Sequence, residues 1–357
     1  MAQAPDPDEQ GRELPSNPSL YDLNRDELAS LLDGEPRFRL DQLWSGLYEK
    51  LLDPADISNL PKTLRGAIEG LLPPGLLQVR RSVSRDGGTI KFLWQLRDGF
   101  LIETVLMHYD DRTTVCISSQ AGCAMACGFC ATGQAGFDRH LTVGEIVEQV
   151  IRAGQEARKV DRRVDNVVFM GMGEPLANFE PVAASIERMN TDLGIGARHL
   201  TVSTVGVVPG IERFTDLGTQ VGLAVSLHAA NDTKRDQLVP LNRRYPLADL
   251  ARACQRYVQT THRRLSFEWA MIDGVNDTQQ DAAELAAYAA PLRAHVNLIP
   301  LNRTPGYPTT GSSMDTIFEF RDRLKAGGVN ATVRRNRGTD IDAACGQLKA
   351  EHRIGRR

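Results

Sequence analysis

Thr114-Val-Cys-Ile-Ser118 is an apolar stretch that predicts a buried strand, and Cys123-Ala-Met-Ala-Cys127-Gly-Phe-Cys130 follows it closely. The second stretch places three thiols within eight residues, at CxxxCxxC spacing. Three thiolates can bind one metal cluster but cannot complete a site of four cysteines. Such a cluster would keep one iron free for a small molecule.

The rest of the chain around this loop predicts alternating strands and helices. We expect strands at Thr114–Ser118, Asn166–Met170, Leu200–Thr204, Val221–Leu227, Leu265–Met271 and Val296–Leu301, and a last strand at Ala331–Arg335. Helical patterns lie between them at Val143–Lys159, Val182–Leu193, Leu247–Gln259, Asp281–Leu292 and Ser313–Ala326. Six βα units predict an α/β fold with a parallel sheet, an incomplete (β/α)6 barrel. Chemistry in such barrels collects at the carboxyl ends of the strands, where the cysteine loop falls.

The chain before the barrel predicts helices and then a hairpin. Leucines at three-to-four spacing indicate helices in residues 19–77, and Thr89–Leu96 and Phe100–Met107 flank an Asp-Gly turn. We therefore expect five parts: a disordered 1–18, a helical accessory domain at 19–77, a β-hairpin linker at 78–108, the partial barrel at 109–346 and a basic tail at 347–357.

Composition narrows the class of protein. The 357 residues are 41% hydrophobic and 24% charged, which is typical of a soluble globular protein. No apolar run is long enough to cross a bilayer, and the acidic, Pro-rich start is unlike a secretion signal, so we expect a cytoplasmic protein with reduced thiols. Residues 1–60 carry 13 acidic and 5 basic side chains, whereas residues 321–357 carry 4 and 10. A basic end suits a phosphate-rich partner, or it is a solvated tail.

The six cysteines allow competing interpretations. Cys254 falls on the apolar side of its helix and is expected in the core. For the CxxxCxxC loop, zinc normally needs a fourth ligand, and a disulfide framework is unexpected in a reducing compartment. A [4Fe–4S] cluster explains three thiolates directly and would bind S-adenosylmethionine (SAM) at its fourth iron, the pattern of radical SAM enzymes. Cys116 and Cys345 are either unrelated buried thiols or a nucleophile with its resolving partner.

Longer blocks of the sequence resemble the RlmN/Cfr radical methyltransferases. They are the segments 118–133, 136–142, 169–175, 202–209, 226–228, 297–302 and 338–346. The Gly136-Phe-Asp-Arg139 stretch is more similar to the RlmN branch, which methylates adenine C2, than to the Cfr branch, which methylates C8. The resemblance implies that 23S rRNA, at the peptidyl-transferase centre, is a substrate, together with a tRNA adenosine next to the anticodon.

The resemblance also implies a mechanism that uses two SAM molecules per turnover. One SAM would methylate Cys345, and a second would give the 5′-deoxyadenosyl radical that activates this methyl group for addition to adenine. Cys116 would then attack the Cys345 sulfur and release the product, leaving a disulfide. Glu103 would accept the C2 proton, although by its position alone it could be an outward-facing strand residue. An electron donor such as flavodoxin and a monomeric enzyme are expected.

Further residues match cofactor contacts of the family or are candidates to bind RNA. The expected SAM contacts are Gly173, Glu174, Ser203, Ser226, Leu227, His228 and Asn302. Candidate phosphate contacts are Arg334–Arg337 and Arg353–Arg357, and the accessory domain would contact RNA through Arg37, Arg39, Lys62 and Arg65. An alternative of another class is a metal-cluster RNA-binding protein without catalytic turnover.

Overall fold

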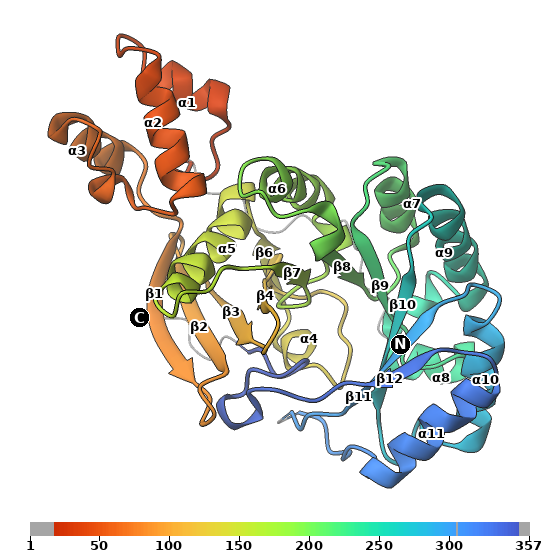
Figure 1. The fold of residues 1–357 in the computed structure, drawn as a ribbon. Coiled ribbons are helices and arrows are strands. Elements are labelled where there is room, and N and C mark those ends of the chain that lie inside the picture. Colours follow the sequence, from red (N-terminus) through yellow and green to blue (C-terminus); the bar gives the residue numbers. More distant parts are fainter. Residues whose placement is uncertain (1–17, 305, 350–357) are drawn as a thin grey trace.

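A ten-stranded sheet forms the centre of the computed structural model, which describes residues 18–304 and 306–349. The strand order is β1-β2-β3-β4-β7-β8-β9-β10-β11-β12 (Figure 1). From β4 onward every neighbouring pair is parallel. These strands are β4 (Thr113–Cys116), β7 (Asn166–Phe169), β8 (Leu200–Thr204), β9 (Gly222–Ser226), β10 (Leu265–Met271), β11 (His295–Pro300) and β12 (Ala331–Val333). The predicted incomplete (β/α)6 barrel is confirmed.

Helices cover the outside of this curved sheet (Figure 1). They are α5 (Val143–Arg158), α6 (Phe179–Thr191), α7 (Val208–Asp216), α8 (Asp232–Leu238), α9 (Leu247–Thr261), α10 (Gln279–Ala289) and α11 (Met314–Ala326). Short 3-10 turns lie in the connections at Pro175–Ala177, Ala197–His199 and Pro240–Arg243, and another follows β12 at Thr339–Ile341. Cys254 is fully buried on α9, as predicted. The sequence had not indicated α7 and α8, both of which are short.

The hairpin before the barrel is part of the same sheet. Strands β2 (Thr89–Leu96) and β3 (Leu101–His108) pair antiparallel as predicted, and β3 pairs antiparallel with β4. A further strand, β1 (Leu76–Val83), extends the sheet at its edge. Its mostly exposed residues lack a clear alternation of apolar and polar side chains, so the sequence did not predict its full length.

The N-terminal helices lie beside β1 and the outer helix α5 (Figure 1). They comprise α1 (Arg25–Leu31), α2 (Phe38–Trp44), a π-helical turn at Ser45–Glu49, a 3-10 turn at Pro54–Asp56 and α3 (Lys62–Leu71). Asp22 accepts a 2.8 Å hydrogen bond from the Gly144 amide at the start of α5, and Arg158 donates to the Glu49 carbonyl at 2.7 Å. The predicted helical domain is therefore in direct contact with the barrel. Among the described residues, no helix has the length and apolarity needed to span a membrane.

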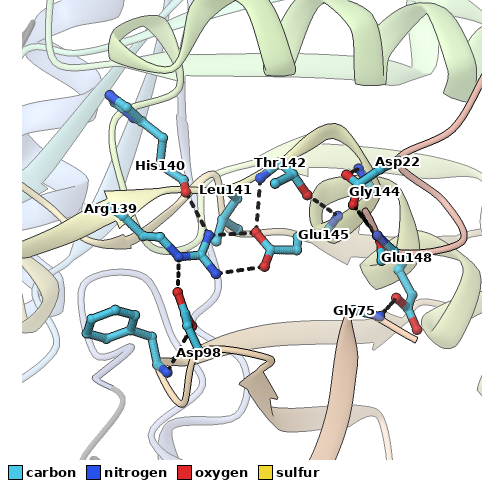
Figure 2. A network of polar contacts seen from close by, with 12 residues as sticks. Asp22, Gly75, Asp98, Arg139, His140, Leu141, Thr142, Gly144, Glu145 and Glu148 are labelled. Atoms are coloured by element: carbon cyan, nitrogen blue, oxygen red, sulfur yellow. Dashed lines mark hydrogen bonds and ion pairs between the residues drawn. The ribbon is translucent and has the colours of Figure 1, made fainter. Parts of the chain in front are cut away.

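A buried arginine fixes the small hairpin around the cysteine loop (Figure 2). Strands β5 (Gln120–Gly122) and β6 (Phe137–His140) flank the loop and the short α4 (Ala131–Ala135). Arg139 on β6 is fully buried and donates to both carboxylate oxygens of Glu145, at 2.7 and 2.8 Å, and to Asp98 in the β2–β3 turn. This network joins β6, the start of α5 and the hairpin, so the loop has a rigid frame.

Candidate active site

The three cysteines of the CxxxCxxC loop line one cavity of ≈ 160 Å³ at the carboxyl ends of the barrel strands. Cys123 follows β5, and Cys130 is the residue directly before α4. The loop is tightly packed, because a Cβ atom on Gly133 would lie 2.9 Å from the Cys127 carbonyl oxygen. The backbone therefore holds the three thiols around a common space.

The donor set of this cavity fits an iron–sulfur cluster. Burial, assisted by the neighbouring Cys130 thiol, raises the pKa of Cys127 to about 12, and burial also raises the pKa of Cys123 well above its usual value. Thiolates at these positions thus need a strong positive partner, which a metal cluster supplies. Within residues 18–304 and 306–349, no three His, Cys, Asp or Glu side chains are grouped for a single metal ion. The thiols instead surround a cavity, as a cluster with one thiolate per iron requires.

Gly173 and Glu174 lie in the loop that follows β7 and line this cavity. Gly173 has a φ of 100°, and a Cβ there would lie 2.5 Å from Cβ of Gln120, so only glycine fits. The Glu174 carboxylate is buried and accepts amide hydrogen bonds from Leu176 at 3.0 Å and Val205 at 2.8 Å. Burial raises its pKa to about 7, although these hydrogen bonds oppose the rise. A cationic ligand group beside this carboxylate would favour its ionised form.

His228 lines the same cavity and is held in one tautomer. Its Nδ1 accepts a 3.0 Å hydrogen bond from the Ala270 amide, so Nε2 carries the proton. Burial, assisted by Arg235, lowers its pKa to about 3, and its ring packs edge-on against Phe129 at 4.7 Å. A φ of 59° at this non-glycine residue is a strained geometry of the kind that collects at functional sites.

The other expected cofactor contacts divide into two groups. Ser203 at β8, Ser226 at β9 and Asn302 after β11 line the same cavity as the three cysteines. Leu227 is fully buried and is absent from the described lining of this cavity. Its carbonyl instead accepts a 3.1 Å hydrogen bond from Arg235. A role for Leu227 through its backbone thus remains a prediction.

Cys345 lies between the cavity of the three loop cysteines, called the main cavity below, and a second cavity. It lines both cavities, and Cys116, at the end of β4, lines the second. Asn302 donates a 3.0 Å hydrogen bond to the Cys345 carbonyl and accepts a 2.7 Å hydrogen bond from Asn336. Cys345 is solvent-accessible because it faces these cavities, but protein atoms surround it, so burial raises the pKa of its thiol. Two cysteines 229 positions apart in the sequence thus lie at one place in the fold.

Arg334 and Glu268 join these thiols and were not identified as active-site residues from the sequence. Both line the main cavity, and their side chains are 3.4 Å apart. Arg334 also lines the second cavity. Burial raises the pKa of Cys345 and raises that of Cys116 to about 12, and the positive charge of Arg334 opposes both rises. A carboxylate within the apolar Leu265–Met271 run was the available signal for Glu268. For Arg334, the sequence pattern had suggested only a phosphate contact.

Glu103 is placed apart from the main cavity. It is buried on β3 and lines a third, polar cavity together with Lys91 and Lys349. Its carboxylate forms a 3.0 Å ion pair with Lys91 and accepts a 2.7 Å hydrogen bond from the Lys349 amide. It is thus an inward-facing residue, contrary to the alternative of an outward-facing one, but the structure does not bring it to the cysteine loop.

The segment after Cys345 binds both Glu103 and α4. The Gly346 carbonyl accepts a 2.8 Å hydrogen bond from the Ala131 amide, and the Leu348 carbonyl accepts one of 2.7 Å from the Thr132 hydroxyl. The segment is therefore anchored on α4, immediately after the last cysteine of the loop. The predicted phosphate contacts Arg353–Arg357 lie outside the described residues.

This partial barrel, with three loop cysteines around a cavity at its strand ends, defines a radical SAM protein. A model of the Radical SAM superfamily matches residues 117–286. A crystal structure of a radical SAM methyltransferase from Sphaerobacter thermophilus has a TM-score of 0.91 and 50% identity, and the match covers 94% of this chain and 100% of that one.

Two curated relatives specify the family. Both are described as a probable dual-specificity RNA methyltransferase RlmN. The relative from Frankia alni is 47% identical over 93% of this chain and 83% of its own length. The relative from Bacillus subtilis is 43% identical over 94% of each chain. The chain belongs to the RlmN family of radical SAM RNA methyltransferases.

Proposed function

We propose that this enzyme methylates C2 of adenine in 23S rRNA, and in the tRNA adenosine next to the anticodon, through a methylated Cys345. The names of its relatives support RNA as the substrate and two kinds of RNA as targets. The Gly136-Phe-Asp-Arg139 stretch supports C2 over C8, because it is more similar to the RlmN branch than to the Cfr branch.

The observation that carries the proposal is the position of Cys345 between two cavities. In one cavity its neighbours are the three loop cysteines and the expected SAM contacts, and in the other its neighbour is Cys116. A thiol that first receives a methyl group and later exchanges with a second thiol needs access to both places. An isolated structural cysteine has no such requirement.

The residues of the chain have distinct tasks in this reaction. Cys123, Cys127 and Cys130 would hold a [4Fe–4S] cluster, which, together with SAM, would supply the methyl group and the radical chemistry. Cys345 must ionise to accept a methyl group, and the Arg334 guanidinium beside it favours the thiolate. Once the carbon on Cys345 is joined to adenine, the Cys116 thiolate attacks the Cys345 sulfur, and the S–S bond forms as the bond from that sulfur to the transferred carbon breaks. The electron pair of the broken bond goes to the product, which takes up a proton to complete its methyl group, and an external thiol reductant returns the disulfide to two thiols.

Glu103 is the proposed acceptor of the adenine C2 proton, and it must become accessible first. In the present arrangement one carboxylate oxygen accepts the Lys349 amide, and Lys91 neutralises the group. Displacement of the segment that includes Gly346–Lys349 would free the carboxylate and widen the cavity for RNA. We therefore place proton transfer after a movement of this segment.

The partners and domain roles complete the proposal. An external one-electron donor of the flavodoxin type would reduce the cluster, and a single chain would suffice, because the three cavities are formed within one chain. The accessory domain at residues 19–77 would contact RNA, joined by the hairpin at 78–108 to the barrel at 109–346.

The decisive experiment is nucleoside mass spectrometry after anaerobic reconstitution with iron, sulfide, SAM and a reductant. Wild-type enzyme should convert adenosine in 23S rRNA and in tRNA to 2-methyladenosine, and Cys345→Ala should abolish this while retaining the cluster. Cys254→Ala is the matched control and should retain activity, because Cys254 is buried in α9 and lines neither of these two cavities. Formation of 8-methyladenosine would favour the Cfr-type reaction, and a colourless protein containing one zinc would overturn the enzyme proposal.

A further inference from the structure

Arg235 on α8 is a buried cation that forms no direct contact with a carboxylate among the described residues. Its side chain is 1% exposed, and within the described part of the chain it forms no ion pair. The two nearest carboxylates in the sequence accept other donors: Asp232 accepts 2.9 Å hydrogen bonds from Asn242 and the Leu247 amide, and Asp236 accepts one of 2.7 Å from Asn242. A charge in the protein interior is unfavourable unless an opposite charge compensates it. Asp232 acts on Arg235 only at a distance, with Asn242 between them, so a further negative charge nearby would stabilise the guanidinium.

The guanidinium binds the backbone at the ends of two neighbouring strands. It donates to the Val205 carbonyl at 2.6 Å, to the Leu227 carbonyl at 3.1 Å and to the Ser226 carbonyl at 3.4 Å. Asn242 accepts a fourth hydrogen bond at 2.8 Å. Val205 follows β8, and Ser226 ends β9. One side chain thus links the two loops that carry the expected SAM contacts of these strands.

The same guanidinium lies directly behind the lining of the main cavity, because Val205 and Ser226, whose carbonyls it binds, both line that cavity. It opposes the burial-driven rise in the pKa of Cys127, and it helps to lower the pKa of His228. Cys127 and His228 both line the main cavity, so the positive charge of Arg235 acts on groups inside this cavity. A [4Fe–4S] cluster on three thiolates is an anion, and its negative charge increases on one-electron reduction. Such a cluster is a suitable counter-charge for Arg235.

We propose that Arg235 is a positioning residue that compensates the charge of the thiolate-bound cluster and fixes the strand ends that contact SAM. The proposal deepens the proposed function and rests on it, since it requires a cluster on the three loop cysteines. A nearby buried cation stabilises the more negative, reduced cluster and therefore makes its reduction easier. The charge and the hydrogen bonds of Arg235 have separable effects: the charge acts on reduction, and the hydrogen bonds act on SAM binding.

Two substitutions separate these effects in the reconstituted full-length protein. Arg235→Gln retains hydrogen-bond donors but removes the charge. At a fixed potential the ratio of reduced to oxidised cluster, followed by electron paramagnetic resonance, should fall about tenfold, which is about 59 mV for one electron. Arg235→Lys retains the charge but loses the planar fork of donors. Its ratio should stay within about threefold of wild type, while the dissociation constant for SAM rises about tenfold.

Arg252→Gln on α9 is the matched control, because it removes an equal charge from a side chain that is 72% exposed, and it should leave the ratio unchanged. The proposal is overturned if Arg235→Gln leaves the ratio unchanged, or if the Gln and Lys variants lower it equally. If Arg235→Gln fails to load the cluster, the Arg235→Lys variant tests the proposal. A tenfold fall in the ratio of reduced to oxidised cluster in that variant overturns the proposal, whereas a ratio near wild type together with weaker SAM binding supports it. A wild-type protein that holds the cluster but does not methylate RNA would overturn the proposed function alone.

Discussion

Replacement of Glu174 by Gln should weaken SAM binding and remove its dependence on pH near neutrality. The carboxylate is buried, and amide hydrogen bonds from Leu176 and Val205 hold it in place, so it has little freedom to move away from a bound ligand. A hydrogen bond to a charged group contributes about 1.5–3 kcal/mol, which corresponds to roughly a 10- to 150-fold increase in the dissociation constant.

The pH dependence has a definite sign. Burial raises the pKa of Glu174 to about 7, so the carboxyl group becomes protonated as the pH falls below neutrality. A cationic amino group binds only the ionised form, and the ionised fraction falls about tenfold between pH 8 and pH 6. The dissociation constant of the wild-type protein should therefore rise about tenfold over this interval. That of Glu174→Gln should change by less than about twofold.

Equilibrium binding of SAM to reconstituted, oxidised protein at pH 6, 7 and 8 measures both effects. A Cys345→Ala background prevents methylation of that thiol during the assay. Glu268→Gln is the matched control, because it removes the same charge from the same cavity, but Glu268 already has Arg334 as a cationic partner. This control should retain the pH dependence. The reasoning would be refuted if Glu174→Gln kept the wild-type slope, or if only Glu268→Gln lost it.

Three further predictions concern other parts of the structure. Cys116→Ala should accumulate a covalent protein–RNA adduct on denaturing gels, and normal product release would exclude Cys116 as the resolving thiol. Arg139→Met should lower the free energy of unfolding by about 3–5 kcal/mol, because it leaves buried Glu145 without its cationic partner. Urea unfolding measures this loss, and the double variant with Glu145→Leu should recover most of the lost stability. Asn302→Ala should slow methylation of Cys345 about fivefold, because one hydrogen bond of about 1 kcal/mol to the Cys345 backbone is lost. Intact-protein mass spectrometry measures this rate, and an unchanged rate would contradict the positioning role of Asn302.

The regular part of the barrel could be predicted because each strand is a short apolar run between amphipathic helices. Leu200–Thr204 and Leu265–Met271 have the predicted bounds, and Leu247–Thr261 differs from its prediction only at the end. Elements with mixed patterns could not be predicted in the same way. Strand β1 is an exposed edge, and α8 is seven residues long, so neither has enough periodic positions to stand out.

The site was predictable where the chemistry lies in consecutive residues, and less so where it depends on the fold. The cysteine spacing indicated three ligands around one space, and the structure places all three on one cavity. Arg235 had no such signal, because a basic residue in a short polar segment usually lies at the surface. Only the folded chain shows that it is buried beneath two strand ends.

The continuous sheet has a practical consequence for attempts to isolate the catalytic half of the enzyme. Strand β3 pairs along β4 from His108↔Thr113 to Val105↔Cys116, so the hairpin occupies the outer edge of the first barrel strand. A shortened chain that begins at residue 109 would leave that edge unpaired, next to the cysteine loop. Unprotected edges of this kind pair with other molecules and aggregate. Insolubility of such a fragment would then reflect a missing neighbour strand, and would say nothing about whether the remaining residues can perform chemistry.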